Sequence, residues 1–212
     1  MTKSTDLQHR VITVIGIRLL SQSLGEQLTK LLGRHKMIQR FLRSQLQKFE
    51  RQHNYDASYM HHINQHSSSA AARLLLFSAM TDFKGANVNV WAGAALNSTL
   101  SGDCGPCAQL SIDRSIELGV PAEGLKACLN KDWTQAKEVG LGFRFSNAVL
   151  ENSDSLQPLR DEIKLEHGET TLIAASYAAS CFQVYPLIKR ALGYDKQCEQ
   201  LQIDDSTLAY VP

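Results

Sequence analysis

Apolar residues recur at steps of three and four positions along most of the chain, which is the period of an amphipathic helix. The first such segment covers 17–52, where Gly25 and Gly33 are expected to divide it into two helices. The polar stretch 53–69 then predicts a linker that ends in three serines, one of which can cap the next helix.

Further amphipathic segments predict helices over about 70–81, 88–100, 107–118, 132–150, 156–167 and 169–192. Gly119 and Gly193 stand where helices often end, and Pro121 is placed to open another short helix. No series of strands, fixed-period repeat or low-complexity tract is evident in the sequence. The sequence therefore predicts an all-α fold, with 195–212 as a partly ordered tail.

The composition is that of a soluble globular protein: 212 residues, 43% hydrophobic and 20% charged. A formal net charge of +1 argues against binding of nucleic acid or membranes by the whole chain. The N-terminal apolar stretch contains Arg18 and lacks a cleavage site typical of secretory signals. No stretch reaches the ~18–20 apolar residues needed to span a bilayer. We therefore expect a cytoplasmic protein with no nucleic-acid partner and no membrane partner.

Charge is unevenly distributed along the chain. Residues 1–60 contain ten Lys/Arg and four Asp/Glu, whereas residues 101–212 contain ten and sixteen. A basic arm can bind anions, but the solvated face of an amphipathic helix has the same composition. We favour the second interpretation because no Lys/Arg run exceeds two residues.

The strongest candidate for chemistry is the tetrapeptide Cys104-Gly-Pro-Cys107. The other cysteines, Cys128, Cys181 and Cys198, are isolated in the sequence. Two cysteines three positions apart at the start of a helix share one face, where unpaired N–H groups and the helix dipole favour thiolate. The spacing supplies an attacking thiol and a resolving thiol. The pair is therefore predicted to be a reactive dithiol, capable of peroxide reduction or thiol exchange.

The residues around the pair suggest how its helix begins. Pro106 suits a first helical turn, so the helix is expected to start at Cys104 or just before it, with Asp103 or Ser101 as the cap. The neighbouring glycines and Pro106 indicate an exposed turn. The helix dipole would make Cys104 the more acidic thiol.

Three other interpretations of the pair are open. A structural zinc site needs four ligands, whereas the next Cys or His after Cys107 is the isolated Cys128. Thioredoxins have the same tetrapeptide, but they place it after a strand in a βαβ unit. Two buried structural cysteines are the third interpretation, against which the exposed turn counts. No metal and no cofactor is expected.

The segment resembles the alkylhydroperoxidase D-like and carboxymuconolactone decarboxylase family. The likeness lies in three features: the alanine-rich stretch Ala92–Asp103, the Cys104–Cys107 pair with its helix ending at Glu117-Leu-Gly-Val-Pro121, and the Ala-Leu-Gly ending of the stretch 170–193. It covers roughly residues 70–194.

The resemblance implies an alkylhydroperoxidase D-like helical bundle and a homo-oligomer. The expected division is an N-terminal helical extension or oligomerisation arm over 1–66, the helical domain over 67–194, and the tail over 195–212. Its implied activity is that of a thiol-dependent oxidoreductase in antioxidant defence, acting on a peroxide or disulfide. A reducing partner protein or a small thiol would regenerate it.

The resemblance also implies residue roles, in which Cys107 attacks peroxide and Cys104 resolves it. The redox-active branch has the motif Cys-x-x-Cys-x-x-x-His and a glutamate twelve residues before the first cysteine; these two positions hold Ser111 and Ala92 here. Ser111 follows Cys107 by one turn and can hydrogen-bond its thiolate, but a hydroxyl is no base at neutral pH. The candidate catalytic residues are therefore Cys104, Cys107 and Ser111.

Two functions stay open from the sequence. The first is the thiol oxidoreductase that cycles between dithiol and disulfide. The second is a catalytically degenerate helical scaffold or redox-sensing binding protein, which the absence of histidine and glutamate at Ser111 and Ala92 favours. The decarboxylase branch of the family is a more distant third, because its chemistry does not need paired cysteines.

Other residues invite structural interpretations. His62 and His66, beside His61, share a helix face, but an exposed cluster without a metal is favoured because no glutamate lies between them. Trp91 and Trp133 are expected in the core. A buried stripe is expected from three residues at four-residue steps in the last helix: Tyr177, Cys181 and Tyr185.

Overall fold

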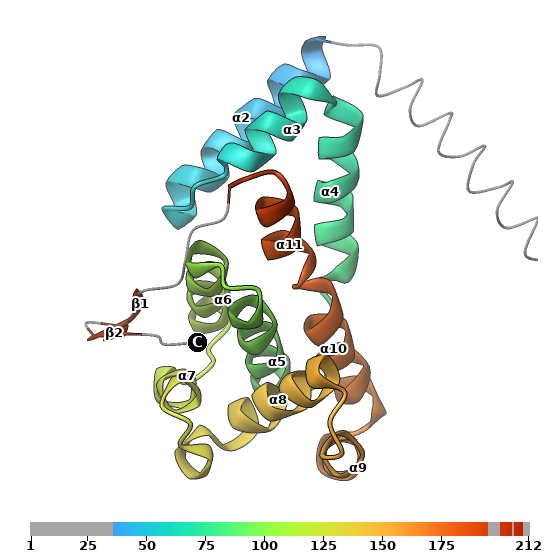
Figure 1. Cartoon of the computed structure of the whole chain (residues 1–212), viewed down its shortest axis with the longest axis vertical. Coiled ribbons are helices and arrows are strands. Elements are labelled where there is room, and N and C mark those ends of the chain that lie inside the picture. Colours follow the sequence, from blue (N-terminus) through green and yellow to red (C-terminus); the bar gives the residue numbers. More distant parts are fainter. Residues whose placement is uncertain (1–35, 195–199, 205, 210–212) are drawn as a thin grey trace, which may run out of the picture.

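The expected all-α fold is present over the part of the chain that the structure describes. The structure is a computed structural model that describes residues 36–194, 200–204 and 206–209. The helix expected before residue 36 lies outside these ranges. The elements, labelled as in Figure 1, are α2 (Lys36–His53), α3 (Ser58–His66), α4 (Ser68–Thr81), α5 (Val88–Ser101), α6 (Gly105–Glu117), α7 (Ala122–Leu129), α8 (Trp133–Glu151), α9 (Leu156–His167), α10 (Glu169–Cys181), α11 (Val184–Ala191), β1 (Gln200–Ile203) and β2 (Ser206–Ala209).

Polar side chains cap several of these helices. The Ser67 hydroxyl accepts a hydrogen bond from the backbone N–H of Ala70 at 3.2 Å and caps α4. Asn87 caps α5 and Asp132 caps α8 in the same way. Each cap satisfies a backbone donor that the first helical turn leaves unpaired. The prediction that a serine at the end of 53–69 caps the following helix is confirmed.

The prediction of a linker over 53–69 is wrong in its main part, because helix α3 occupies most of it. The helix is rich in polar residues, so the apolar period that marks the other helices is weak. It buries Tyr59, Met60 and Asn64, and the Asn64 side chain donates to the backbone carbonyl of Gln39 at 3.0 Å. Packing against α2 and α4 therefore stabilises a helix that its own sequence pattern does not reveal.

The helix expected over 169–192 is two helices, α10 and α11, separated at Phe182 and Gln183. Pro186 accounts for the break, because a proline ring clashes with the carbonyl group four residues earlier, here that of Phe182. A helix that starts at Val184 instead places Pro186 in the first turn, where its missing N–H is tolerated. The break directs α11 into the space between α4 and α6 (Figure 1).

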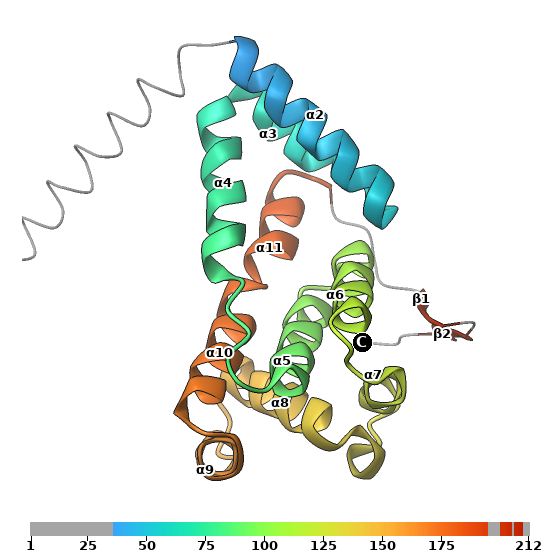
Figure 2. The ribbon, with the colours of Figure 1, turned by 180° about the vertical axis from the view of Figure 1, so that it is seen from behind.

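Helix α5 forms the centre of the main core. All its residues from Val90 to Leu100 are buried, and it packs against α8, α10 and α6, as seen from behind in Figure 2. Two glycines let α5 and α8 approach closely. A Cβ at Gly93 would overlap the Val139 carbonyl oxygen, and a Cβ at Gly142 would overlap that of Val90. The crossing lies near the start of α5, and the turn that carries the two cysteines follows the other end of this helix.

Helices α2, α3 and α4 form an arm over α11 and α6 (Figures 1 and 2). A second apolar cluster lies within the arm, and its buried members are Leu46, Tyr55, Ala57, Tyr59, Met60 and Leu74. Leu110 of α6 and Tyr185 of α11 pack against this cluster. The Tyr185 hydroxyl also hydrogen-bonds with Ser78 and Thr81 of α4. The arm is therefore joined to the bundle on the side where α6 carries its cysteines.

Part of the tail expected over 195–212 is a β-hairpin packed on α6. Strands β1 and β2 are antiparallel, with Gln200 opposite Ala209 and Ile203 opposite Ser206. Leu201 and Ile203 are fully buried in the main core. This short hairpin is the only strand structure in the described ranges and leaves the fold class all-α.

One helical stretch, Glu169–Ala191, is long and apolar enough to cross a membrane by length and composition, and 33% of its 18-residue apolar window is buried. A core helix of a soluble protein passes the same test. Here the stretch is divided at Phe182 and Gln183, and α10 packs against α5, α8 and α9. Within the described residues, the indication of a membrane span is therefore weak.

Candidate functional site

The turn between α5 and α6 places both cysteines at the first turn of α6. Asp103 has a φ of 50°, in the left-handed region, and the chain reverses there. Cys104 then takes extended backbone and serves as the N-cap of α6, because its Sγ accepts a hydrogen bond from the Cys107 N–H at 3.3 Å. The two cysteines form a disulfide, with 5.2 Å between their Cα atoms. The expectation of Asp103 or Ser101 as the cap is wrong, since the chain reversal at 103 moves the N-cap to Cys104.

The exposed turn expected at the cysteines is also wrong. Cys104 is 1% exposed and Cys107 is 5% exposed. Helix α11 covers the turn: Gly102 lies against Pro186, and the Arg190 guanidinium donates to the Gly102 carbonyl at 2.6 Å. Both cysteines are therefore buried, as they would be if their role were structural.

Two residues that the sequence did not single out lie beside the disulfide. The Tyr55 hydroxyl is 3.9 Å from Cys107 Sγ, and the Lys189 ammonium donates to this hydroxyl at 3.4 Å. Lys189 is 2% exposed, and its Nζ lies over the rings of Tyr55 and Tyr59 at 4.9 and 5.4 Å from their centroids. The arm and α11 thus bring a phenol and a lysine to the sulfur that α6 presents.

The two tyrosines are neutral phenols at physiological pH. Burial, followed by the interaction with Tyr59, raises the pKa of Tyr55 well above its usual 10. Burial also raises the pKa of Tyr59 to about 12. A disulfide sulfur carries no hydrogen, so the Tyr55 hydroxyl is the donor toward Cys107. Tyr55 can therefore donate a hydrogen bond to this sulfur but does not act as its base.

Ser111 and Ala92 have different surroundings. Ser111 lies one turn after Cys107 and is 4% exposed. Its hydroxyl has no hydrogen-bond partner within the described residues. Ala92 is fully buried in α5 among apolar residues, so a carboxylate at this position would be placed in the core. Of these two positions, Ser111 alone faces the cavity described next.

A cavity of about 410 Å³ lies between the arm and the bundle, a volume within the range of small-molecule sites. Its lining is mainly apolar and includes Leu46, Phe49, Leu74, Leu75, Leu110 and Phe182. Cys107 and Ser111 belong to the part of the lining that α6 contributes, and Tyr55, beside Cys107, is contributed by the arm. One sulfur of the disulfide thus faces a mainly apolar, partly open cavity.

The far end of the cavity contains an ion-pair cluster. The Asp82 carboxylate is 2.9 Å from the Arg114 guanidinium and 2.7 Å from the Lys84 ammonium. Burial opposes ionisation of Asp82, but the hydrogen bond and charge of Lys84 and the charge of Arg114 outweigh it, so its pKa lies below its usual value. This cluster joins the end of the arm to α6.

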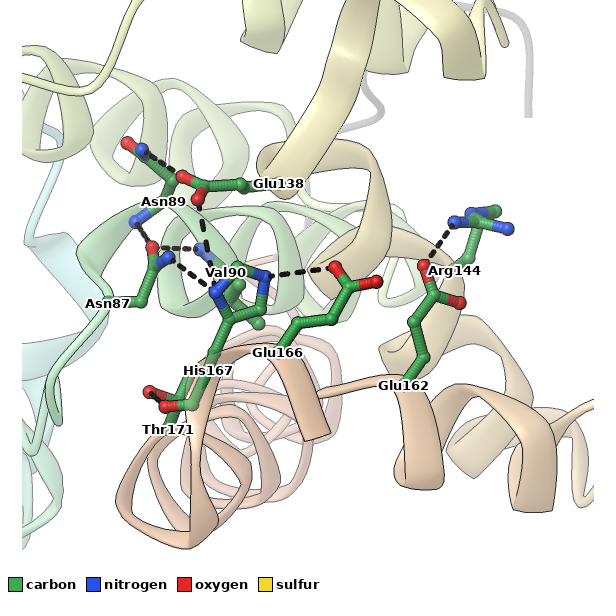
Figure 3. Close-up of polar contacts among 9 residues, drawn as sticks. All are labelled: Asn87, Asn89, Val90, Glu138, Arg144, Glu162, Glu166, His167 and Thr171. Atoms are coloured by element: carbon green, nitrogen blue, oxygen red, sulfur yellow. Dashed lines mark hydrogen bonds and ion pairs between the residues drawn. The ribbon is translucent and has the colours of Figure 1, made fainter. Parts of the chain in front are cut away.

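A separate polar cluster surrounds His167, at the junction of α9 and α10. Figure 3 shows its imidazole between Asn87 and the carboxylates of Glu138 and Glu166. Asn87 Nδ2 is 3.2 Å from the imidazole Nδ1, and the two carboxylates are 3.9 and 3.8 Å from ring nitrogens. Within the described part of the chain, no group of three or more His, Cys, Asp and Glu could hold a metal ion. The cluster fastens α9 to the start of α5 and to α8.

The remaining residues singled out from the sequence have mixed outcomes. Trp91 is buried as expected, but Trp133 is 37% exposed, and Tyr177 is 43% exposed instead of part of a buried stripe. Helix α10 turns that side chain outward, against Phe83, whereas Tyr185 faces the cavity from α11. His62 is half-buried and hydrogen-bonded to the Tyr194 hydroxyl at 3.2 Å instead of fully exposed.

Sequence reasoning gave little signal for Tyr55 and Lys189. Tyr55 falls in the stretch expected to be a linker, and it is 52 residues from Cys107. Lys189 could have been found more easily than Tyr55. It lies four residues after Tyr185, on the face of α11 that is otherwise apolar. A lysine on a buried helix face indicates a paired or functional group, and that was the signal available.

The fold and the site define an all-α protein with a buried Cys-x-x-Cys disulfide at the wall of an apolar cavity. In comparison with known proteins, the chain matches no family model, no curated protein and no solved structure. The resemblance to the alkylhydroperoxidase D-like family therefore stays a prediction from the sequence.

Proposed function

We propose that this protein is a thiol-dependent oxidoreductase of the peroxidase or disulfide-exchange type, which serves antioxidant defence as a divergent alkylhydroperoxidase D-like protein. The observation that supports this most strongly is the Cys104–Cys107 disulfide at the first turn of α6, with Cys107 in the wall of a mainly apolar cavity. A substrate in the cavity would meet Cys107 and not Cys104. The placement supports Cys107 as the attacking sulfur and Cys104 as the resolving one.

The proposed reaction begins from the reduced pair. The Cys107 thiolate attacks one oxygen of a peroxide ROOH, the O–O bond breaks, and ROH leaves with a proton while Cys107 becomes a sulfenic acid. The Cys104 thiolate then attacks Cys107 Sγ, which forms the disulfide and releases water. A reducing partner protein or a small thiol returns two electrons and two protons. In disulfide exchange, the Cys107 thiolate attacks a substrate disulfide instead.

Tyr55 and Lys189 support this proposal by their position beside Cys107. A hydrogen bond from the Tyr55 hydroxyl to the thiolate stabilises the anion, and the hydrogen bond that Lys189 Nζ donates to the same hydroxyl acts in the same direction. The pair stabilises a thiolate without removing its proton, so the proton passes to solvent or substrate. This arrangement differs from the histidine and glutamate expected from the resemblance.

The second candidate is a catalytically degenerate scaffold or redox-sensing binding protein. Two observations favour it: both cysteines are at least 95% buried, and Ser111 and Ala92 hold no ionisable group. In such a protein the disulfide would fix the start of α6, and its reduction would loosen the contact between α6 and α11.

The test is mass spectrometry of thiol alkylation on the reduced protein, before and after mild peroxide. We expect Cys104 and Cys107 to alkylate fastest and to lose alkylation together after peroxide, with a loss of two hydrogens. Cys128 serves as the internal reference, because burial raises its pKa to about 12. Turnover should be lost in Cys104→Ser and in Cys107→Ser, and retained in the control Cys181→Ser.

The outcome that contradicts an oxidoreductase is alkylation of Cys104 and Cys107 at no more than the rate of Cys128. Reversible disulfide formation without turnover would support the redox sensor instead. We further propose a cytoplasmic location, since a reducing compartment supplies the electrons that the cycle needs, and a homo-oligomer, as the resemblance implies.

A further inference from the structure

The cavity between the arm and the bundle opens beside α2. Three of the described residues that line it are exposed, and all three belong to this helix: Gln45, Lys48 and Gln52. They stand at i, i+3 and i+7, so they share one helix face. The other described lining residues are buried or half-buried. The mouth of the cavity is therefore polar, and it presents the ammonium group of Lys48.

The interior of the cavity offers little to a polar group. The buried part of its lining is mainly apolar. The hydroxyl groups of Thr81 and Thr99, which belong to this part, donate to carbonyls of their own helices. Ser111 Oγ and Trp91 Nε1 are covered by neighbouring atoms, so a molecule in the cavity does not reach them. A polar group placed in the interior would lose its hydration without compensation, whereas an apolar chain is accommodated.

Within the described residues, one basic side chain of the lining has no acidic partner. This lining contains two basic residues, Lys48 and Arg114, and one acidic residue, Asp82. The Asp82 carboxylate is already paired with Arg114 at 2.9 Å and with Lys84 at 2.7 Å. No ion pair of Lys48 is found in the described part of the chain. An anion would therefore gain a partner at the mouth, whereas a cation would find the carboxylate taken.

We propose that this cavity binds an anionic amphiphile of the fatty-acid class, with an apolar tail and a carboxylate. The tail lies along the buried lining, where it displaces water from apolar surface. The carboxylate stays at the mouth, where Lys48 binds it and solvent still hydrates it. Gln45 and Gln52 precede and follow Lys48 on the same face and supply amide N–H donors to the carboxylate. Occupancy of the cavity by water alone is the competing state.

The two ends of the ligand have different places relative to the disulfide. Cys107 is 5% exposed and belongs to the buried lining, so the tail and not the carboxylate meets its sulfur. Lys189 does not draw the carboxylate inward, because its ammonium lies over the rings of Tyr55 and Tyr59 and is not part of the described lining. That the tail carries the group on which the thiol acts rests on the proposed function, whereas the binding of the anion does not.

Isothermal titration calorimetry of the full oxidised chain with decanoate, decanol and decylammonium tests the proposal, since the three probes share one tail. We expect decanoate to bind most tightly and decylammonium least tightly. Lys48→Gln should weaken decanoate binding about threefold and Lys48→Glu about tenfold, because an exposed ion pair contributes a modest factor. Decanol binding should stay unchanged in both variants. Added salt should weaken the binding of decanoate and not that of decanol.

The matched control changes a different cation of the same helix. Arg43 is exposed on α2 but does not line the cavity, and it lies about 140° around the helix from Lys48. Arg43→Glu should leave the affinity for decanoate unchanged. Leu75→Trp, which fills the cavity, should abolish the binding of decanoate and decanol alike. Circular dichroism of every variant checks that the helices are intact.

Equal affinities for decanoate and decanol, unaffected by Lys48→Glu, would overturn the assignment of an anion. Equal losses in Arg43→Glu and Lys48→Glu would overturn the role of Lys48 at the mouth. Absence of binding by all three probes would leave water as the occupant and overturn the site.

The Cys104→Ser/Cys107→Ser double variant separates the ligand site from the proposed function, because it cannot cycle but should still bind decanoate. Thiol turnover in a wild-type chain that binds none of the probes would overturn the ligand site alone. Decanoate binding by a wild-type chain without turnover would overturn the oxidoreductase and leave the ligand site standing.

Discussion

The reactivity of the Cys107 sulfur depends on the groups within a few ångströms of it. The Tyr55 hydroxyl is 3.9 Å away and stays protonated, since burial raises its pKa. When the disulfide is reduced, this hydroxyl can donate to a thiolate and stabilise it. Lys189, at 3.4 Å from the same hydroxyl, polarises the donor. A single phenol from the arm therefore sets the local environment of a sulfur on α6.

Tyr55→Phe keeps the ring and removes the hydroxyl. In a Cys104→Ser background, we expect the pKa of the Cys107 thiol to rise by roughly one unit, because the anion loses a donor. The alkylation rate of Cys107 at pH 7, measured across a pH series, should fall several-fold. Tyr194→Phe is the matched control, since its hydroxyl is hydrogen-bonded to His62 and not to Tyr55 or the sulfur. An unchanged pH profile in Tyr55→Phe would show that the phenol does not act on the thiolate.

The sequence was sufficient to find the cysteine pair but not its neighbours. Two cysteines three apart are visible in a linear pattern, and Pro106 marks a helix start. Tyr55 and Lys189 reach Cys107 only through the packing of α11 and the arm, over separations of 52 and 82 residues along the chain. The burial of both cysteines was also missed, because glycine and proline mark a turn without showing what covers it.

At the scale of elements, the apolar period predicted α4, α5, α6, α8 and α9 within a few residues, and Pro121 marked the start of α7. The same pattern missed elements whose structure depends on tertiary contacts. Helix α3 has a weak pattern and depends on packing against α2 and α4. The break between α10 and α11 followed from one residue, Pro186, whose place inside a continuous apolar pattern hid the division.

Helix α8 contains a strained residue at its N-terminal part. Lys137 has φ 47° and ψ −127°, which are not helical, so α8 is two helical segments that meet at a kink there; the Lys137 side chain is exposed. Lys137→Gly should raise the free energy of unfolding by about 1 kcal/mol, because glycine adopts such a backbone without the Cβ clash. Urea unfolding measures the change. Lys137→Ala is the control and should give no gain; equal effects of the two substitutions would contradict the strain.

At the scale of the whole molecule, two units meet around the cavity. The arm contributes one wall and the bundle the other. Their polar connection at the far end is Asp82, which follows α4, with Arg114 of α6. The attachment of the arm to the bundle therefore depends on an ion pair as well as on the apolar cluster.

The stability of this junction should depend on pH. Lys84 and Arg114 outweigh the effect of burial and hold the pKa of Asp82 below its usual value of 3.8. Its stabilising contribution is therefore complete above 3.8 and is lost as the pH falls through the lower folded value. In urea unfolding, Asp82→Asn should be less stable than wild type at neutral pH, and the difference should shrink below about pH 3.8. Asp154→Asn, an exposed carboxylate, is the control; a constant difference across pH would contradict the role of this charge.

The crossing of α5 and α8 has a consequence for how related chains could be recognised. Any side chain at Gly93 or Gly142 would overlap a carbonyl oxygen of the partner helix, so descent with this architecture requires glycine at both places. Cysteines can be lost when a protein changes its chemistry, whereas the crossing cannot be altered without separating the two helices. Distant relatives that have abandoned the dithiol would still have this pair of glycines.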